Sequence, residues 1–350
     1  MKKKNYLTRR NFLKGTATVA AGAVALGVQG CANTDQQLAT LSTPAQPPSA
    51  DQPLVGIARH ESTEETVRQA IALVSGLGFI SQGDTILLKP NVNSGDPYPY
   101  STNPEVVAAV TKLAFEHGAA HVFVADTSNP FYLPTVGAMD RAGIYQMAID
   151  SGAEVMDLGV EGYTLITPKN AVNWPGGFRV PSLFHDVDHV INLPACKDHL
   201  MANYTMSLKN WMGVIPEAER MYVHSSDFGT RIPELHFGVS PSLTILDATR
   251  ADLTGGAAPG LTPNPVSASP GLIVATTDPV ACDVTGLAIL KHNLKERDLT
   301  NERIDNFTVW SQPQIVHASK VGIGIRNSAE YSVSSQNVPE IDDLMTYINI

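Results

Sequence analysis

Short segments rich in apolar residues alternate along this chain with segments of helical periodicity. The apolar segments have the length and continuity of buried β-strands, because a strand covered on both faces needs no polar alternation. They lie at residues 85–88, 122–125, 154–158, 188–193, 243–247 and 272–275. Strands separated by helices favour a largely parallel sheet with helices on both faces. The sequence therefore predicts an α/β fold, either as one large domain or as two lobes.

The helical segments carry recognisable start signals. Ser62 stands three residues before Glu65, the spacing of a capping box, and Pro104 occupies the first position of a second helix. Helices are predicted at residues 62–74, 103–118, 135–142, 145–151, 205–211 and 278–290. Residues 160–185 are expected to form loops or antiparallel strands, and the glycine- and proline-rich residues 254–270 a long loop.

Several predicted strands end in polar side chains. In open α/β sheets, ligands bind in the crevice at the carboxyl ends of the strands. The polar residues at these ends are Lys89, Asn91, Asp126, Lys197, His199 and Asp247. We therefore expect these side chains to converge on one crevice.

Residues 192–213 (NLPACKDHLMANYTMSLKNWMG) hold a dense group of reactive side chains directly after a predicted strand. A packed core does not favour such a composition, because burying a lysine or a histidine without partners is costly. The reactive side chains are Cys196, Lys197, Asp198, His199, Asn203, Tyr204, Lys209, Asn210 and Trp211. This stretch is predicted to form much of the functional site.

Three lysines in and near these segments favour an anion-binding site. Lysine is a compact point charge suited to carboxylate or phosphate, although a solvated surface charge is the alternative for any one lysine. The predicted substrate-binding residues are Lys89, Asn91 and Asn210. The predicted catalytic residues are Lys197, His199 and Lys209. A desolvated lysine at position 209 could act as a base or form a Schiff base.

A metal site is a second possibility. The candidate ligands Asp126, His199, His224 and Asp247 suit Zn²⁺ or Fe²⁺. The chain has no compact ligand motif such as HExxH, and each histidine could instead cap a turn or bind a carbonyl. The two aspartates could also orient a histidine.

Cysteine use and missing motifs argue against two other classes of cofactor. Besides Cys31 the chain has only Cys196 and Cys282, which could pair and which also suit core positions. Cys196 precedes Lys197, a neighbour that could stabilise a thiolate. The lack of a CxxC cluster argues against a cysteine-ligated iron–sulfur cluster, and the lack of GxGxxG and GxxxxGKS motifs argues against a nucleotide cofactor.

The N-terminus has the order of an export signal. Residues 1–30 contain the pair Arg9 and Arg10 followed by small, moderately apolar residues, as in twin-arginine signal peptides. Cys31 follows in a lipobox-like context and is the predicted lipidation site, while cleavage by ordinary signal peptidase with a free Cys31 thiol is the alternative. Residues 31–53 are predicted to be a flexible tether. The expected partners are the twin-arginine translocation machinery and, through the lipid, a membrane on its periplasmic or other extracytoplasmic side.

The predicted mature body is strongly acidic. Residues 1–30 hold six of the 24 basic residues and none of the 34 acidic ones, which leaves 18 basic against 34 acidic residues and a net charge of −16. Nucleic acid is therefore not an expected partner. An anionic ligand must be held by locally gathered cationic side chains and backbone amides.

Several segments together resemble an uncharacterised family, domain-of-unknown-function family 362. Its members carry a KPN segment, a segment with lysine and histidine two residues apart, and a KN-containing segment before a histidine. The matching segments lie at 89–91, 197–199, 207–214, 224, 246–248 and 278–283. The resemblance spans about residues 54–325, which leaves 326–350 as a C-terminal extension, and Asp198 stands where the family often has threonine. Because the family has no settled activity, the resemblance implies a site and no reaction.

Two functions are consistent with these features. The first is an exported, lipid-anchored enzyme that acts on a small anionic substrate, with or without a divalent metal. Lys89 and Lys197 would hold the substrate, and His199 or Lys209 would transfer a proton. The second is a non-catalytic lipoprotein that binds a metal or an anion for a membrane partner.

Overall fold

The computed structural model describes residues 54–350 apart from 75, 130–132, 225–226 and 257–259. The predicted signal peptide, Cys31 and the whole of the tether therefore lie outside the described residues. In the part that is described, no helix combines the length and the apolar character that a bilayer crossing requires.

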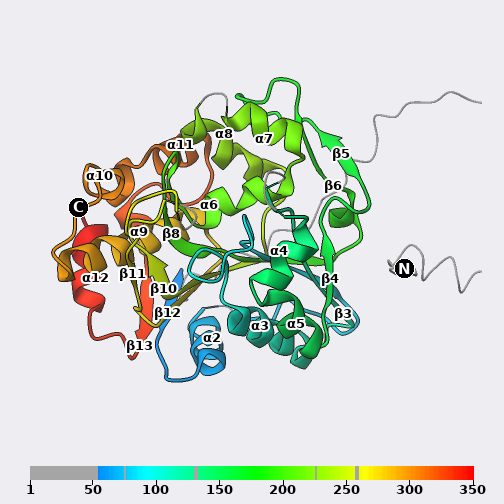
Figure 1. The fold of residues 1–350 in the computed structure, drawn as a ribbon, viewed down its shortest axis with the longest axis horizontal. Coiled ribbons are helices and arrows are strands. Elements are labelled where there is room, and N and C mark those ends of the chain that lie inside the picture. Colours follow the sequence, from blue (N-terminus) through cyan, green and yellow to red (C-terminus); the bar gives the residue numbers. More distant parts are fainter. Residues whose placement is uncertain (1–53, 75, 130–132, 225–226, 257–259) are drawn as a thin grey trace, which may run out of the picture.

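A long mixed sheet forms the centre of the molecule (Figure 1). Its strands follow the order β13-β1-β12-β10-β7-β2-β3-β4. Their bounds are β1 Val55–Ala58, β2 Thr85–Pro90, β3 His121–Asp126, β4 Glu154–Asp157, β7 His189–Leu193, β10 Leu243–Asp252, β12 Leu272–Thr276 and β13 Val333–Gln336. Neighbours from β10 through β7, β2 and β3 to β4 pair in parallel, which confirms the predicted largely parallel sheet.

Strand β12 departs from the parallel pattern. It pairs antiparallel with both β10 and β1. The connection from β10 to β12 contains the predicted long loop and the short strand β11 (Ser267–Ala268), with no crossover helix among its described residues. A parallel pairing needs such a crossover, whereas an antiparallel pairing does not.

Helices cover both faces of the sheet. In Figure 1, α2, α3 and α5 lie below the sheet, and α6, α7, α8, α9 and α11 lie above it. The helix bounds are α2 Thr63–Ala72, α3 Pro104–Glu116, α4 Thr135–Arg141, α5 Ile144–Asp150, α6 Ser207–Asn210, α7 Glu217–His224, α8 Phe228–Glu234, α9 Pro279–Glu296, α10 Glu302–Asp305, α11 Pro313–Val321 and α12 Ile341–Ile348. The start signals seen in the sequence act as caps, since Ser62, Asn103 and Asp278 each accept backbone N–H groups from the first turn of their helices.

Two hydrophobic clusters fill the space between the sheet and its helices. Successive residues of β2 point to opposite clusters: Leu87 packs into one, and Ile86 and Leu88 into the other. This alternation explains why the strand is apolar without interruption, since both of its faces are covered.

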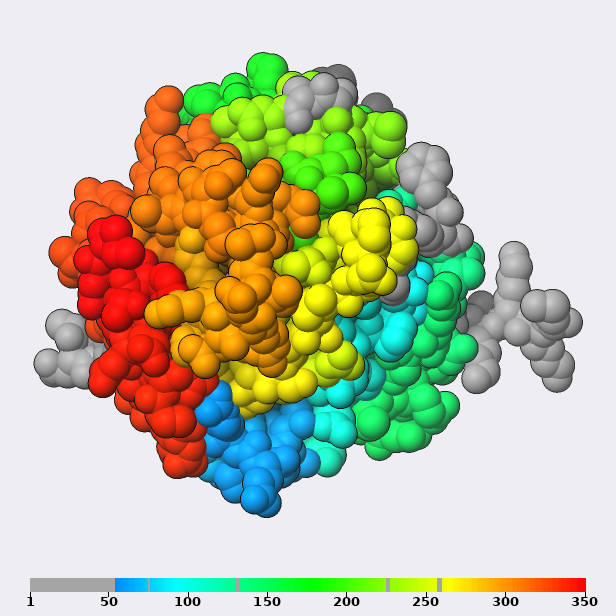
Figure 2. All heavy atoms as spheres, turned by 60° about the vertical axis from the view of Figure 1, so that its left-hand side comes forward, coloured from blue at the N-terminus to red at the C-terminus, as the bar shows by residue number. Residues whose placement is uncertain are grey.

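Residues 160–185 contain the expected antiparallel strands. Strand β5 (Tyr163–Ile166) pairs with β6 (Phe178–Pro181) as a separate two-stranded sheet. At the other end of the chain, residues 326–350 add the edge strand β13 beside β1, and α12 packs on α9. In Figure 2 these red residues adjoin the blue start of the described chain, so the C-terminal segment is part of the same fold.

The segment that carries most of the predicted site forms a side branch of the sheet after β7. Strand β8 (Ala195–His199) pairs with β10 and then with β9 (Asn203–Thr205). A helix was expected from Thr205, but Thr205 pairs with Lys197 in this small ladder and α6 begins only at Ser207. The buried carboxylate of Asp283 on α9 fixes that start, because it accepts the backbone N–H groups of Ser207 at 2.7 Å and Leu208 at 3.3 Å.

Candidate active site

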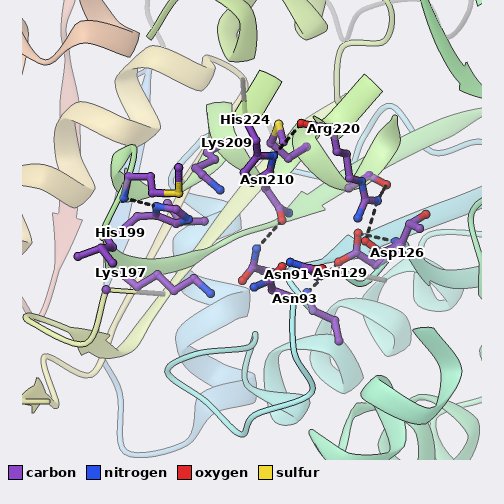
Figure 3. A pocket seen from close by; sticks show the side chains of 18 of the residues that line it. Asn91, Asn93, Asp126, Asn129, Lys197, His199, Lys209, Asn210, Arg220 and His224 are labelled. Carbon is purple, nitrogen blue, oxygen red and sulfur yellow. Dashed lines mark hydrogen bonds between the residues drawn. The ribbon is translucent and has the colours of Figure 1, made fainter. Parts of the chain in front are cut away.

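A cavity of about 380 Å³ lies at the carboxyl ends of β2, β3 and β8, beneath α6 and α7. Of the nine residues predicted to be catalytic, substrate-binding or metal-binding, eight line it: Lys89, Asn91, Asp126, Lys197, His199, Lys209, Asn210 and His224. Figure 3 shows Lys197 and His199 reaching in from one side, Lys209 from α6, and Asp126 and Arg220 on the opposite side. Several segments far apart in the sequence therefore build one cavity.

Asp247 does not join the others, so this part of the prediction is wrong. Strand β10 continues to Asp252, which leaves Asp247 in mid-strand instead of at the strand end. Its buried carboxylate accepts the backbone N–H of Asn103 at 2.7 Å and both N–H and O–H of Thr249. Asp247 thus fixes the start of α3, while Asp252 takes the position opposite Lys197.

A buried ion pair closes one wall of the cavity. Lys89 Nζ donates to Asp126 Oδ1 at 2.7 Å, and the two side chains are 0% and 3% exposed. The backbone N–H groups of Thr127 and Val92 also donate to the Asp126 carboxylate. Burial lowers the pKa of Lys89, although the attraction of Asp126 opposes this change. The charge of Lys89 is therefore committed to Asp126.

Gly213 permits this close arrangement. A Cβ atom at position 213 would lie 2.2 Å from Asp126 Oδ1 and 2.7 Å from Lys89 Nζ. Both distances are far below any real carbon contact, so a side chain at 213 would push the ion pair apart.

The side-chain amides of Asn91 and Asn210, both predicted to bind substrate, form a hydrogen bond with each other. Asn210 Oδ1 accepts from Asn91 Nδ2 at 2.9 Å and from Lys89 Nζ at 3.3 Å, while Asn210 Nδ2 donates to Asn192 Oδ1 at 2.7 Å. Among the described residues, Asn91 Oδ1 is a buried acceptor without a donor. Lys89, Asn91 and Asn210 therefore form a hydrogen-bonded wall, in which most of their donor groups are already used.

Lys197 and Lys209 form no ion pair with a carboxylate among the described residues. Lys197 Nζ donates to the backbone carbonyl of Tyr100, and burial lowers the pKa of Lys197 to about 8 against the opposing effect of Asp252. Lys209 Nζ makes no hydrogen bond or ion pair with any residue that the structure describes. Burial, reinforced by the repulsion of Lys197 and Arg220, lowers the pKa of Lys209 to about 7.

Arg220 on α7 is a cationic residue that sequence reasoning missed. Its buried guanidinium donates to the backbone carbonyls of Ile215, Ser128, Thr127 and Gly213. These carbonyls satisfy the donors without removing the positive charge. In the sequence, Arg220 lies three residues before Val223, a spacing that places both side chains on one face of a helix. In the structure both residues are buried.

Backbone hydrogen bonds fix the two predicted site histidines, His199 and His224, in opposite tautomers. His199 Nδ1 accepts the backbone N–H groups of Met201 at 3.1 Å and Ala202 at 3.2 Å, so the ring is neutral with its proton on Nε2. Burial, with Lys209 and Lys197 nearby, lowers the pKa of His199 well below its usual value. His224 Nδ1 donates to the carbonyl of Arg220 at 2.7 Å, which leaves a lone pair on Nε2. His199 is thus a hydrogen-bond donor and His224 an acceptor.

The predicted metal ligands are not assembled as a set. Within the described ranges, no group of three or more His, Cys, Asp or Glu side chains lies close enough to hold a metal ion. Asp247 points elsewhere, Asp126 is bound by Lys89, and the Nδ1 lone pair of His199 is taken by backbone amides. Of the four, only His224 keeps an uncommitted ligand atom.

Neither described cysteine shows signs of reactivity. Cys196 and Cys282 are both free and fully buried, and burial raises the pKa of each thiol well above its usual value. The suggested disulfide between them is absent, and both residues belong to the same hydrophobic cluster.

Comparison with known proteins places the chain in a family. The description "Domain of unknown function (DUF362)" matches residues 86–288, which include all of the predicted site residues from Lys89 to Asp247. The chain belongs to this family. A thylakoid-associated protein of Synechocystis sp. is 29% identical over 235 residues, which cover 65% of this chain and 69% of that relative. The DUF362 match thus spans the cavity and the strands that build it.

Proposed function

We propose that this DUF362 protein is an enzyme that binds a small organic anion in the cavity and transfers a proton to or from it. The observation that carries the proposal is the side chain of Lys209, which faces the cavity beside Lys197 without a carboxylate partner among the described residues. In a chain predicted to carry a mature net charge of −16, a local excess of positive charge requires a reason. An anionic ligand provides it, because it would supply the missing counter-charge.

The side chains around the cavity suit distinct roles in proton transfer. A general acid or base works best when its pKa lies near the operating pH, and the pKa of about 7 for Lys209 meets this condition. Lys197 would hold the anionic group, and the Nε2–H of His199 would donate to an oxygen that gains charge. His224 Nε2 is the second candidate base.

The experiment compares Lys209→Met with wild type by calorimetric titration against acetate, succinate, inorganic phosphate and similar anions. Methionine keeps the apolar stem and removes the charge. Lys320→Met on α11 is the matched control, since Lys320 is exposed on the surface. Loss of anion binding only in Lys209→Met supports the proposal. Equal binding by both variants would refute it.

Analysis of the products distinguishes an enzyme from a protein that only binds the anion. If the bound anion is converted and the conversion depends on Lys209, the protein is an enzyme. If it is bound and released unchanged, the alternative of a binding lipoprotein for a membrane partner takes its place. Dependence on a divalent metal stays a prediction, to be checked by elemental analysis of untagged protein and of His224→Ala.

We further propose that the chain is exported by the twin-arginine pathway and anchored through a lipid on Cys31. The order of Arg9, Arg10, the apolar segment and Cys31 supports this, and the thylakoid association in the name of the Synechocystis relative is consistent with a membrane location. Replacing both arginines by lysine should keep the protein in the cytoplasm, and Cys31→Ala should abolish labelling with radioactive palmitate. A labelled Cys31→Ala protein would contradict the anchor.

A further inference from the structure

Four exposed apolar side chains surround the mouth of the cavity. Leu200, Met201, Met221 and Leu261 are 47%, 55%, 50% and 46% exposed, and all four line the cavity. They come from the turn after β8, from α7, and from the loop after β10. Single exposed apolar residues are ordinary on protein surfaces, but several that meet at one opening mark a binding surface.

This rim is attached to the same elements as the cationic interior. The backbone N–H of Leu200 donates to the carbonyl of Gly256 at 3.0 Å, and the N–H of Gly256 donates to Asp198 at 3.1 Å. Arg303 in turn holds the buried carboxylate of Asp198 through two hydrogen bonds, at 2.9 and 2.6 Å. Figure 2 shows the yellow loop after β10 at the surface against green residues. These hydrogen bonds fix the turn that carries Leu200 and Met201 relative to Lys197 and His199.

The apolar lining continues from the rim into the cavity. Met212 and Val92 are buried and line the wall, and Met212 lies on the segment that follows Lys209. Methionine side chains are unbranched and adaptable, so they pack against flexible chains of varied shape. An apolar chain attached to a ligand at the lysines would therefore find apolar side chains both in the wall and at the rim.

We propose that the ligand is an amphiphile with one anionic head group, a carboxylate or a phosphate monoester, and an apolar chain. This inference rests on the proposed anion-binding function and names its substrate class. The head group lies between Lys197 and Lys209, and the chain runs outward along Met201 and Met221. Glu217 and Arg220 line the cavity from α7 with opposite charges, so α7 supplies no net positive charge for a second anionic group.

The test is a calorimetric series on the full mature protein with acetate, hexanoate and decanoate and with inorganic, hexyl and decyl phosphate, each below its micelle concentration. Affinity should rise by about fourfold for each methylene that reaches the rim, because burial of one methylene contributes about 0.8 kcal/mol. Decyltrimethylammonium has the same chain with a cationic head, and it should not bind. The stronger of the two anionic series identifies the head group.

Rim variants connect the chain-length effect to this surface. Met201→Gln and Met221→Gln should each lower the ratio of decyl-ligand to short-anion affinity several-fold, whereas Met147→Gln, an exposed methionine on α5, should not. Short anions that bind with no gain from chain length would overturn the amphiphile and leave the anion site intact. Failure of every anion to bind would instead refute the proposed function. If affinity still rises equally with chain length in both rim variants, the apolar chain does not bind along Met201 and Met221, and that assignment is overturned.

Discussion

The buried pair of Lys89 and Asp126 supports a quantitative prediction. In Asp126→Asn the shape is retained, but a fully buried ammonium loses its counter-charge 2.7 Å away. In wild type, Lys89 and Thr127 donate to one oxygen of Asp126, and Val92 donates to the other. The side-chain NH₂ of the substituted asparagine would therefore face another donor in either orientation of the amide. Breaking a buried pair in this way costs about 3–5 kcal/mol. We therefore expect a loss of this size in the free energy of unfolding at neutral pH.

The pH dependence of that loss tests its cause. The folded state already lowers the pKa of Lys89 below 10.5, and without Asp126 the pKa falls further. Between the folded and the unfolded pKa the unfolded chain binds more protons, so the free energy of unfolding rises with pH, by at most about 1.4 kcal/mol per pH unit for one proton. The difference between Asp126→Asn and wild type should therefore be largest at neutral or lower pH and should shrink toward pH ~10.

Urea unfolding followed by circular dichroism at several pH values measures these differences. Glu64→Gln is the control, since it removes an exposed partner of Lys112 and should change stability by less than about 1 kcal/mol. A loss below about 1 kcal/mol for Asp126→Asn, or a loss that does not depend on pH, would show that the pair is not a buried, charged interaction.

Three further predictions concern other contacts. Gly213→Ala should cost about 1–3 kcal/mol in urea unfolding, because its Cβ would meet Asp126 and Lys89, whereas Gly137→Ala, with open space around it on α4, should cost nothing. Acylation of Lys209, followed by mass spectrometry of its peptide, should become half-maximal near pH 7 in the folded protein and at a higher pH in the urea-unfolded chain; equal profiles in the two states would refute the lowered pKa. Arg303→Gln should cost about 3–5 kcal/mol, since Asp198 would stay buried without its charge partner, and a neutral result would contradict the importance of that pair.

Local sequence signals determined the elements of this fold. The apolar run of β2 and the capping residues Ser62, Asn103 and Asp278 act over a few residues, so they are visible before any tertiary contact is known. The place of the site was equally predictable. Parallel strands must bring their carboxyl ends to one edge, and the polar residues that follow β2, β3 and β8 do meet there.

Tertiary contacts decided what each site residue can do. The sequence offers Lys89, Lys197 and Lys209 alike as candidate anion-binding residues, yet Lys89 pairs with Asp126, Lys197 donates to a carbonyl, and Lys209 has no hydrogen-bond partner among the described residues. The length of β10 removed Asp247 from the cavity, and amides from the following turn fixed the proton of His199. Periodicity and caps arise from neighbours in the chain, whereas charge state, tautomer and pairing depend on partners from distant segments, which only the folded chain brings together.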